Sequence, residues 1–122
     1  MYQYGGDGTA RVLLEHGAVV DAWDNKDSTP LHFASQCHNA KIACLLLKHG
    51  ADINTLDNDH STPLHMASQY GCTEPTFALL EHGANVHLQD NDGHTPSQVA
   101  SAKGHKEIVC LLLEHLQSKQ KM

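Results

Sequence analysis

Short apolar rows recur along this chain at a constant interval and are separated by polar stretches. A Leu-Leu-charged-His-Gly segment occupies residues 13–17, 46–50 and 79–83, and residues 112–116 repeat it with Leu in place of Gly. A second marker, Thr-Pro, occurs at residues 29–30, 62–63 and 95–96. Both markers keep an interval of 33 residues, which indicates an internal repeat and a stacked architecture.

Each interval predicts a first helix that begins at Thr-Pro, because the threonine hydroxyl can cap a helix and proline suits the first helical position. Its apolar side chains lie about one turn apart, enough for one buried face: Leu31, Ala34, Leu64, Ala67, Val99 and Ala100. We expect this helix to end at Gly71 and Gly104, and at His38 or Asn39 in the earlier repeat.

A second helix follows in each interval, and its apolar rows are predicted to form the core. These rows are Ile42, Ala43, Leu46 and Leu47, then Pro75, Phe77, Leu79 and Leu80, then Ile108, Val109, Leu112 and Leu113. Pro75 fits the first turn of a helix that starts near Thr73. Gly50 and Gly83 suit left-handed caps, and the Asp/Asn-rich segments after them predict hairpin-like turns.

The pattern resembles the ankyrin repeat, whose signature is Asp, two variable residues, Gly, a variable residue, Thr-Pro-Leu-His, a variable residue and Ala. Residues 57–67 match it with His60 in place of the Gly, whereas the next unit keeps Gly93 but has Ser97 and Gln98 where Leu-His is expected. The resemblance covers residues 9–116. It implies an all-α repeat, an ankyrin solenoid of stacked helix-turn-helix units with β-hairpin fingers.

The repeat phase predicts a single ankyrin repeat domain over residues 1–122. It comprises a partial first repeat (1–23), two full repeats (24–56 and 57–89) and a C-terminal capping repeat with its tail (90–122). The first repeat lacks its first helix, so we expect an N-terminus that frays. We expect a monomer, with this truncated end as the route to any association.

Composition and charge limit the kinds of partner and the locations that we expect for this chain. The net charge of -6 leaves no broad basic field for nucleic acid. No apolar stretch is long enough to span a membrane, and residues 1–8 do not resemble a signal peptide. The four cysteines have no CxxC spacing, and we interpret them as thiols, which favours a cytoplasmic or nuclear location.

The resemblance implies that a partner protein meets a concave face built from the fingers and first helices. Carried over position by position, it gives Asn25, Lys26, Ser28, Gln36, Cys37, Asn58, Asp59, Ser61, Gln69, Tyr70, Asn91, Asp92, His94, Ala102 and Lys103, with Trp23, Leu56 and Gln89 one residue earlier in each finger. Trp23 is the strongest anchor candidate. The alternative interpretation is that Trp23 shields the base of its finger or compensates for the missing helix.

Acidic residues gather at the expected fingertips: Asp24, Asp27, Asp57, Asp59, Asp90 and Asp92, against a single Lys26. They would steer a basic segment of a partner to this face. The alternative interpretation is that Asp and Asn are there because turns favour them. Tyr70 has the same two interpretations, a ring contact with a partner or packing at a helix end.

Histidines, cysteines and carboxylates form no catalytic constellation beyond what the repeat explains, so we predict no enzyme, no cofactor and no metal. His16, His49, His82 and His115 fall on successive helices, too far apart to share a zinc ion. The resemblance implies that His32 and His65 tie a helix to the adjoining finger.

Two other functions stay open. The resemblance implies that Asn54 is a candidate substrate of an asparaginyl hydroxylase. The other alternative is a structural spacer within a larger repeat array.

Overall fold

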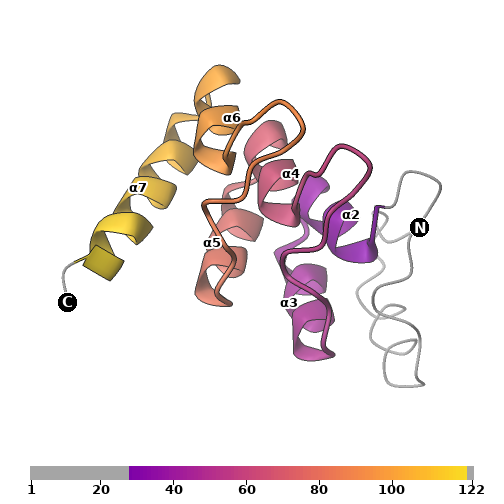
Figure 1. Cartoon of the computed structure of the whole chain (residues 1–122). Coiled ribbons are helices and arrows are strands. Elements are labelled where there is room, and N and C mark those ends of the chain that lie inside the picture. Colours follow the sequence, from indigo (N-terminus) through magenta and orange to yellow (C-terminus); the bar gives the residue numbers. More distant parts are fainter. Residues whose placement is uncertain (1–27, 121–122) are drawn as a thin grey trace.

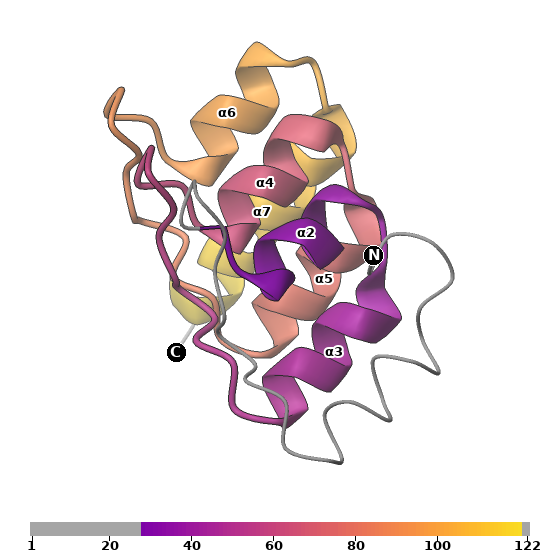
Figure 2. The same ribbon diagram turned by 90° about the vertical axis from the view of Figure 1, so that its right-hand side faces the viewer.

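A computed structural model describes residues 28–120 of the chain, and six helices lie in that range. The first helices of each pair are α2 (Pro30–Gln36), α4 (Pro63–Tyr70) and α6 (Pro96–Ala102), and the second helices are α3 (Ala40–Lys48), α5 (Thr73–Glu81) and α7 (Lys106–Gln120). The first helices form one layer and the second helices another, and the loops between helix pairs run along one side (Figures 1 and 2). The all-α repeat is therefore confirmed.

The first helices begin where the Thr-Pro pairs predict. In α4 the Thr62 hydroxyl accepts a hydrogen bond from the backbone N–H of His65 at 3.1 Å, and the Thr62 N–H donates to the His65 ring at 3.1 Å. Gln98 has the same role at Thr95 in α6. These reciprocal bonds satisfy N–H groups that no helical carbonyl can reach.

The helix ends also follow the prediction. His38 adopts a φ of 60°, and Gly71 and Gly104, which occupy the same repeat position, have φ values of 71° and 77°. Asn39 instead caps α3, since its side chain accepts from the Ile42 N–H at 3.1 Å. Pro75 lies in the first turn of α5, which begins at Thr73 as expected.

One apolar core runs between the two layers. Its larger side chains come from both kinds of helix and are almost fully buried: Leu31, Ile42, Leu46, Leu64, Leu79, Ile108 and Leu112. Alanines at residues 34, 67 and 100, one on each first helix, are also buried. The repeated rows therefore bury the same positions in each described helix pair.

Two residues of the predicted core rows lie on the surface. Phe77 is 53% exposed and Leu113 is 49% exposed. Thr76 takes the interior position in α5 instead, since its hydroxyl donates to the Cys72 carbonyl at 2.8 Å and is satisfied without water. Leu113 is exposed because no described helix packs beyond α7, whereas Leu80, one repeat earlier, is buried.

Two histidines join neighbouring repeats. His32 and His65 each accept a backbone N–H at Nδ1, from Thr29 at 3.0 Å and from Thr62 at 3.1 Å. Their Nε2 atoms lie 2.8 Å from the carbonyls of Ser61 and His94 in the next loop. Nδ1 is thus the acceptor, and Nε2–H donates across the repeat boundary. This is the tie between helix and adjoining loop that the resemblance implied.

The loops between helix pairs are tight turns. In residues 28–120 no β-strand is present, so the expected β-hairpin fingers are seen only as chain reversals. The Asp57 N–H donates to the Ser61 carbonyl at 3.1 Å, and the Asp90 N–H donates to that of His94 at 3.0 Å. A second backbone bond lies within each turn, from the His60 N–H to the Asp57 carbonyl and from the Gly93 N–H to the Asp90 carbonyl. In the described residues no further pairs continue these bonds into a ladder. No helix within this range is long and apolar enough to cross a bilayer.

Candidate functional site

The candidate partner-binding residues divide into two groups in the structure. The turn group lies before α4 and α6 and comprises the exposed residues Leu56, Asn58, Asp59, Asn91, Asp92 and His94. The helix-end group lies at the last turn of the first helices and comprises Gln36, Cys37, Gln69, Tyr70, Ala102 and Lys103. Because α4 has 8 residues, one helix length of about 12 Å separates the groups.

The backbone of the turn group is held by its first aspartates. One carboxylate oxygen of Asp57 accepts the N–H groups of Asp59 and Ser61, both at 2.9 Å. Asp90 does the same for Asp92 at 2.9 Å and for His94 at 3.0 Å. The preference of turns for Asp therefore explains Asp57 and Asp90.

Asp59 and Asp92 differ from those two aspartates. Both are exposed, and within residues 28–120 their carboxylates take part in no hydrogen bond. Turn formation therefore leaves these two carboxylates available to a partner.

Adjacent turns are bonded to one another. The Asn91 N–H donates to the Asp59 carbonyl at 2.9 Å, and the Asn91 side chain donates to the Asn58 carbonyl at 3.2 Å. These bonds fix the spacing of equivalent side chains in successive turns. A partner would therefore meet an ordered row, which lowers the entropy cost of binding.

The helix-end group offers varied chemistry at equivalent positions. Tyr70 is 45% exposed at the end of α4, and Cys37 and Lys103 are its equivalents after α2 and α6. Cys37 is half-buried, and so are Gln36 and Ser28. Tyr70 is the only one of the three that brings an aromatic ring to the surface.

Ser61 does not lie on the accessible surface. It is 8% exposed, because its N–H donates to Asp57 and its carbonyl accepts from His32. Three other predicted residues, Trp23, Asn25 and Lys26, lie outside residues 28–120. The partial first repeat, whose N-terminus was expected to fray, also lies outside this range.

The sequence analysis did not identify one group of possible metal ligands. Side-chain ligand atoms of Asp90, Asp92 and His94 lie within 4.8 Å of one another, and the alternating Asp-x-Asp-x-His spacing was the available signal. The Asp90 oxygen that accepts two N–H groups is already committed to the turn. The sequence analysis rejected the helix-end histidines as zinc ligands, and two of them have another role: the Nδ1 atoms of His49 and His82 bond to carbonyls of their own helices.

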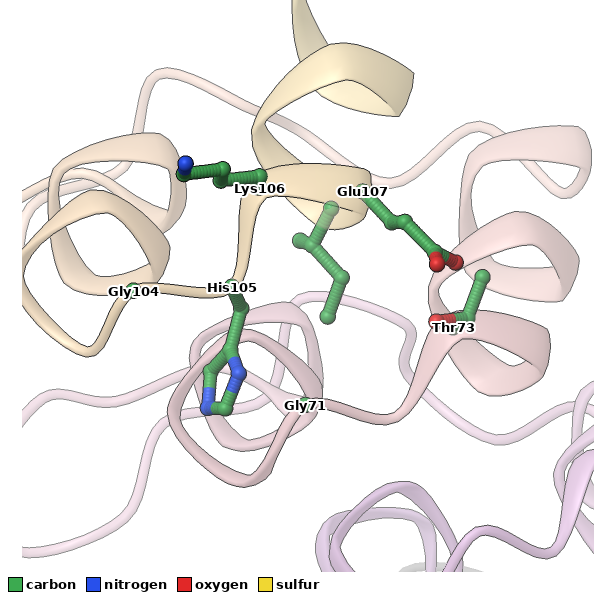
Figure 3. Close-up of a pocket in the computed structure, with 7 residues that line it drawn as sticks. Gly71, Thr73, Gly104, His105, Lys106 and Glu107 are labelled. Carbon is green, nitrogen blue, oxygen red and sulfur yellow. The ribbon is translucent and has the colours of Figure 1, made fainter.

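A polar pocket of ≈ 350 Å³ lies at the links between α4 and α5 and between α6 and α7 (Figure 3). His105 is its most constrained residue, because its Nε2 lies 3.2 Å from the Gln69 carbonyl and its ring packs over Gly71. A Cβ at Gly71 would lie 2.8 Å from that ring. This close contact, together with the φ of 71° at Gly71, accounts for a glycine at this position.

None of the four cysteines forms a disulfide. Cys72 is fully buried, and its Sγ lies 3.5 Å from the Gln36 carbonyl. Burial raises the pKa of the Cys72 thiol, so the group stays protonated at neutral pH and is a poor nucleophile. Cys110 is exposed.

Asn54 is half-buried and bonded to the following loop. Its side-chain oxygen accepts the Asn85 N–H at 2.9 Å, and its own N–H donates to Asp52. In this position the Asn54 side chain is a link between two loops. Its modification stays a prediction.

Stacked helix pairs with a repeated interior and a varied surface define a helical solenoid, a class of protein that recognises partners along its length. The chain belongs to the ankyrin repeat family: a family model for ankyrin repeats (many copies) matches residues 13–67, and one for ankyrin repeats (3 copies) matches residues 52–122. No curated protein sequence matches the chain. Ankyrin repeats are in general protein-protein interaction modules without enzymatic activity.

Proposed function

We propose that this chain binds a partner protein through the concave face formed by its turn group and helix-end group. The observation that carries the proposal is the contrast within each turn. Asp57 and Asp90 hold the backbone, whereas Asp59 and Asp92 are exposed carboxylates without a hydrogen bond in the described residues. Those two carboxylates lie in turns that are bonded to each other.

A basic segment is the partner chemistry that these turns favour. Two exposed carboxylates in adjacent turns attract Lys or Arg, and the attraction raises the association rate and fixes the register of the partner. Tyr70 adds an exposed aromatic ring, a residue type that often dominates binding energy when a partner covers it. The acidic turns would thus orient the partner, and Tyr70 would add affinity.

The test compares protein partners captured from cells by the tagged full chain and by variants, with quantification by mass spectrometry. Asp59→Lys and Tyr70→Ala are expected to lose the same partners. Glu81→Lys on α5 makes the same charge change at an exposed site on the second helices, so a partner that is lost from Asp59→Lys but kept by Glu81→Lys depends on the turns. Far-ultraviolet circular dichroism checks that each variant is folded.

The competing hypothesis is that the chain is a spacer, in which case no partner depends on these residues. Retention of every partner by folded Asp59→Lys and Tyr70→Ala variants would refute the concave-face proposal. Loss of partners from Glu81→Lys alone would move the binding site to the second helices.

A further inference from the structure

The second helices carry an exposed stripe that the concave face does not include. On α5 the stripe is Glu74, Phe77 and Glu81, and on α7 it is Glu107, Cys110 and Glu114. Each set has the spacing i, i+3 and i+7, which places its members on one side of an α-helix. All six residues are exposed, and α5 packs directly against α7. We call these six residues the outer face.

The outer face has an apolar centre between two acidic rows. Phe77 and Cys110 occupy the same repeat position on neighbouring helices and form the centre. One row is Glu74 and Glu107, the other is Glu81 and Glu114, and no ion pair involving any of these four is present in residues 28–120. The Phe77 ring is 53% exposed and stays in contact with water unless a partner covers it, and the four exposed glutamates give its surroundings a negative charge.

The neighbouring helix α3 has the opposite charge at the same positions. Lys41 and Lys48 occupy the places of the two glutamates, and a half-buried Cys44 occupies the place of Phe77. The sign of the charge therefore changes between α3 and α5. A cationic ligand on the outer face would be attracted by the glutamates of α5 and α7 and repelled by the lysines of α3, which restricts where it can lie. Lys106, which is exposed beside Glu107, weakens the attraction at the first turn of α7.

We propose that the outer face binds an amphipathic helix of a partner protein, with a large apolar residue over Phe77 and Cys110 and Lys or Arg along both flanks. The two acidic rows are seven residues apart along each helix, about 10 Å. That distance matches the diameter of an α-helix, about 10–12 Å with side chains. A helix lying across α5 and α7 would seat its apolar side on the centre and extend its basic side chains to the rows.

The same charges argue against other ligands. Nucleic acids and anionic membranes present phosphates, which the four glutamates would repel. A basic, apolar helix is the occupant that satisfies both the ring and the carboxylates. This proposal stands independently of the concave face, which uses different residues.

The probe is a fluorescent amphipathic peptide of about 14 residues, ~21 Å as a helix, with leucines on one side and lysines on both flanks. Binding to the full chain is measured by fluorescence anisotropy at several salt concentrations. A peptide of the same composition in scrambled order is the control for charge alone. The position of the bound peptide is read from the alkylation rate of Cys110, resolved from the other cysteines by mass spectrometry.

We expect the amphipathic peptide to bind more tightly than the scrambled one, to weaken as salt rises, and to slow Cys110 alkylation. Phe77→Ala should weaken binding about tenfold or more, because an aromatic anchor is lost. Glu74→Gln with Glu107→Gln should weaken binding and flatten its salt dependence. Lys41→Glu with Lys48→Glu should strengthen binding, because the repulsive border becomes attractive.

Three results would overturn the proposal. The first is no binding at up to ~1 mM protein. The second is equal affinity for the scrambled peptide. The third is unchanged Cys110 alkylation together with unchanged affinity of Phe77→Ala. If Asp59→Lys then abolished binding, the peptide would lie on the acidic turns, and the concave-face proposal would gain support while this one failed.

Discussion

The buried and exposed sides of the second helices differ in how faithfully they repeat. On the buried side, Leu46, Leu79 and Leu112 occupy one position in three successive helices, and all are about 1% exposed or less. On the exposed side, one repeat position holds Cys44, Phe77 and Cys110. Another holds Lys41, Glu74 and Glu107. Close packing between repeats tolerates little change in volume, whereas solvent imposes no such limit. The differences in residue type between repeats therefore lie mainly on the surface, where a partner can contact them.

The largest expected effect is on the buried side. Leu79→Ala should lower the free energy of unfolding by about 2–5 kcal/mol, because it removes a fully buried side chain and leaves a cavity between repeats. Phe77→Ala, two residues away in the same helix, should change it by no more than about 0.5 kcal/mol. Urea unfolding followed by circular dichroism measures both.

The two substitutions control for each other, since both shorten a large apolar side chain in α5. Equal losses of stability would contradict the assignment of Phe77 to the surface. They would also remove the basis of the outer-face proposal, because Phe77 would then have a structural role.

A smaller effect concerns the histidine that joins two repeats. Burial is the main cause that lowers the pKa of His65 below its ordinary value of about 6.5. The hydrogen bond to the His94 carbonyl and the nearby Asp90 and Asp57 act in the opposite direction, and His32 acts with burial. The unfolded chain therefore binds a proton more readily than the folded chain. The contribution of this residue to stability is complete above about pH 6.5 and is lost as the pH falls toward the lower, folded pKa.

His65→Gln should cost about 1 kcal/mol at pH 7.5, because the Nε2 bond across the repeat boundary is removed. Gln98 shows that glutamine can keep the capping role at this position. The loss of stability between pH 7 and pH 5 should be smaller in this variant than in the parent chain, as measured by urea midpoints. His87→Gln, in an exposed loop, is the control and should keep the parent's dependence. A His65→Gln variant with the parent's full pH dependence would refute this role of His65.

The smallest expected effect on stability concerns His60, an exposed residue whose backbone conformation is constrained. His60 is exposed with a φ of 59°, and Gly93, its equivalent in the next turn, has a φ of 79°. His60→Gly should stabilise the fold by about 0.5–1 kcal/mol, because glycine has no Cβ to strain this conformation. Thermal unfolding of His60→Gly and of the reverse change, Gly93→Ala, should shift in opposite directions. A lower Tm for His60→Gly would mean that the imidazole makes a compensating contact.

The sequence analysis located the helices well because their signals are local. Thr62 and Pro63 specify a helix start by their own chemistry, and Pro75 is tolerated only in a first turn. It was less successful in choosing which neighbouring residue faces inward. Phe77 is the more apolar residue, yet Thr76 is buried, because its position relative to Leu79 and its bond to the Cys72 carbonyl decide the matter.

The candidate site was predicted only in part for the same reason. The fingertip aspartates were found as a class, but only hydrogen bonds separate Asp57, which holds its turn, from Asp59, which does not. Ser61 was expected on the surface and is buried by the His32 contact from the preceding repeat. The outer face was missed altogether, because Phe77 was assigned to the core.

The order of residues by itself determined the repeat length, the helix starts and the family, since these depend on side chains close together along the chain. Only the tertiary structure decided which side chains are covered, because burial depends on the neighbouring repeat 33 residues away. Leu80 and Leu113 have the same type and repeat position, yet one is buried and the other exposed. Contacts between stacked repeats, which local sequence does not specify, determine which surface remains for a partner.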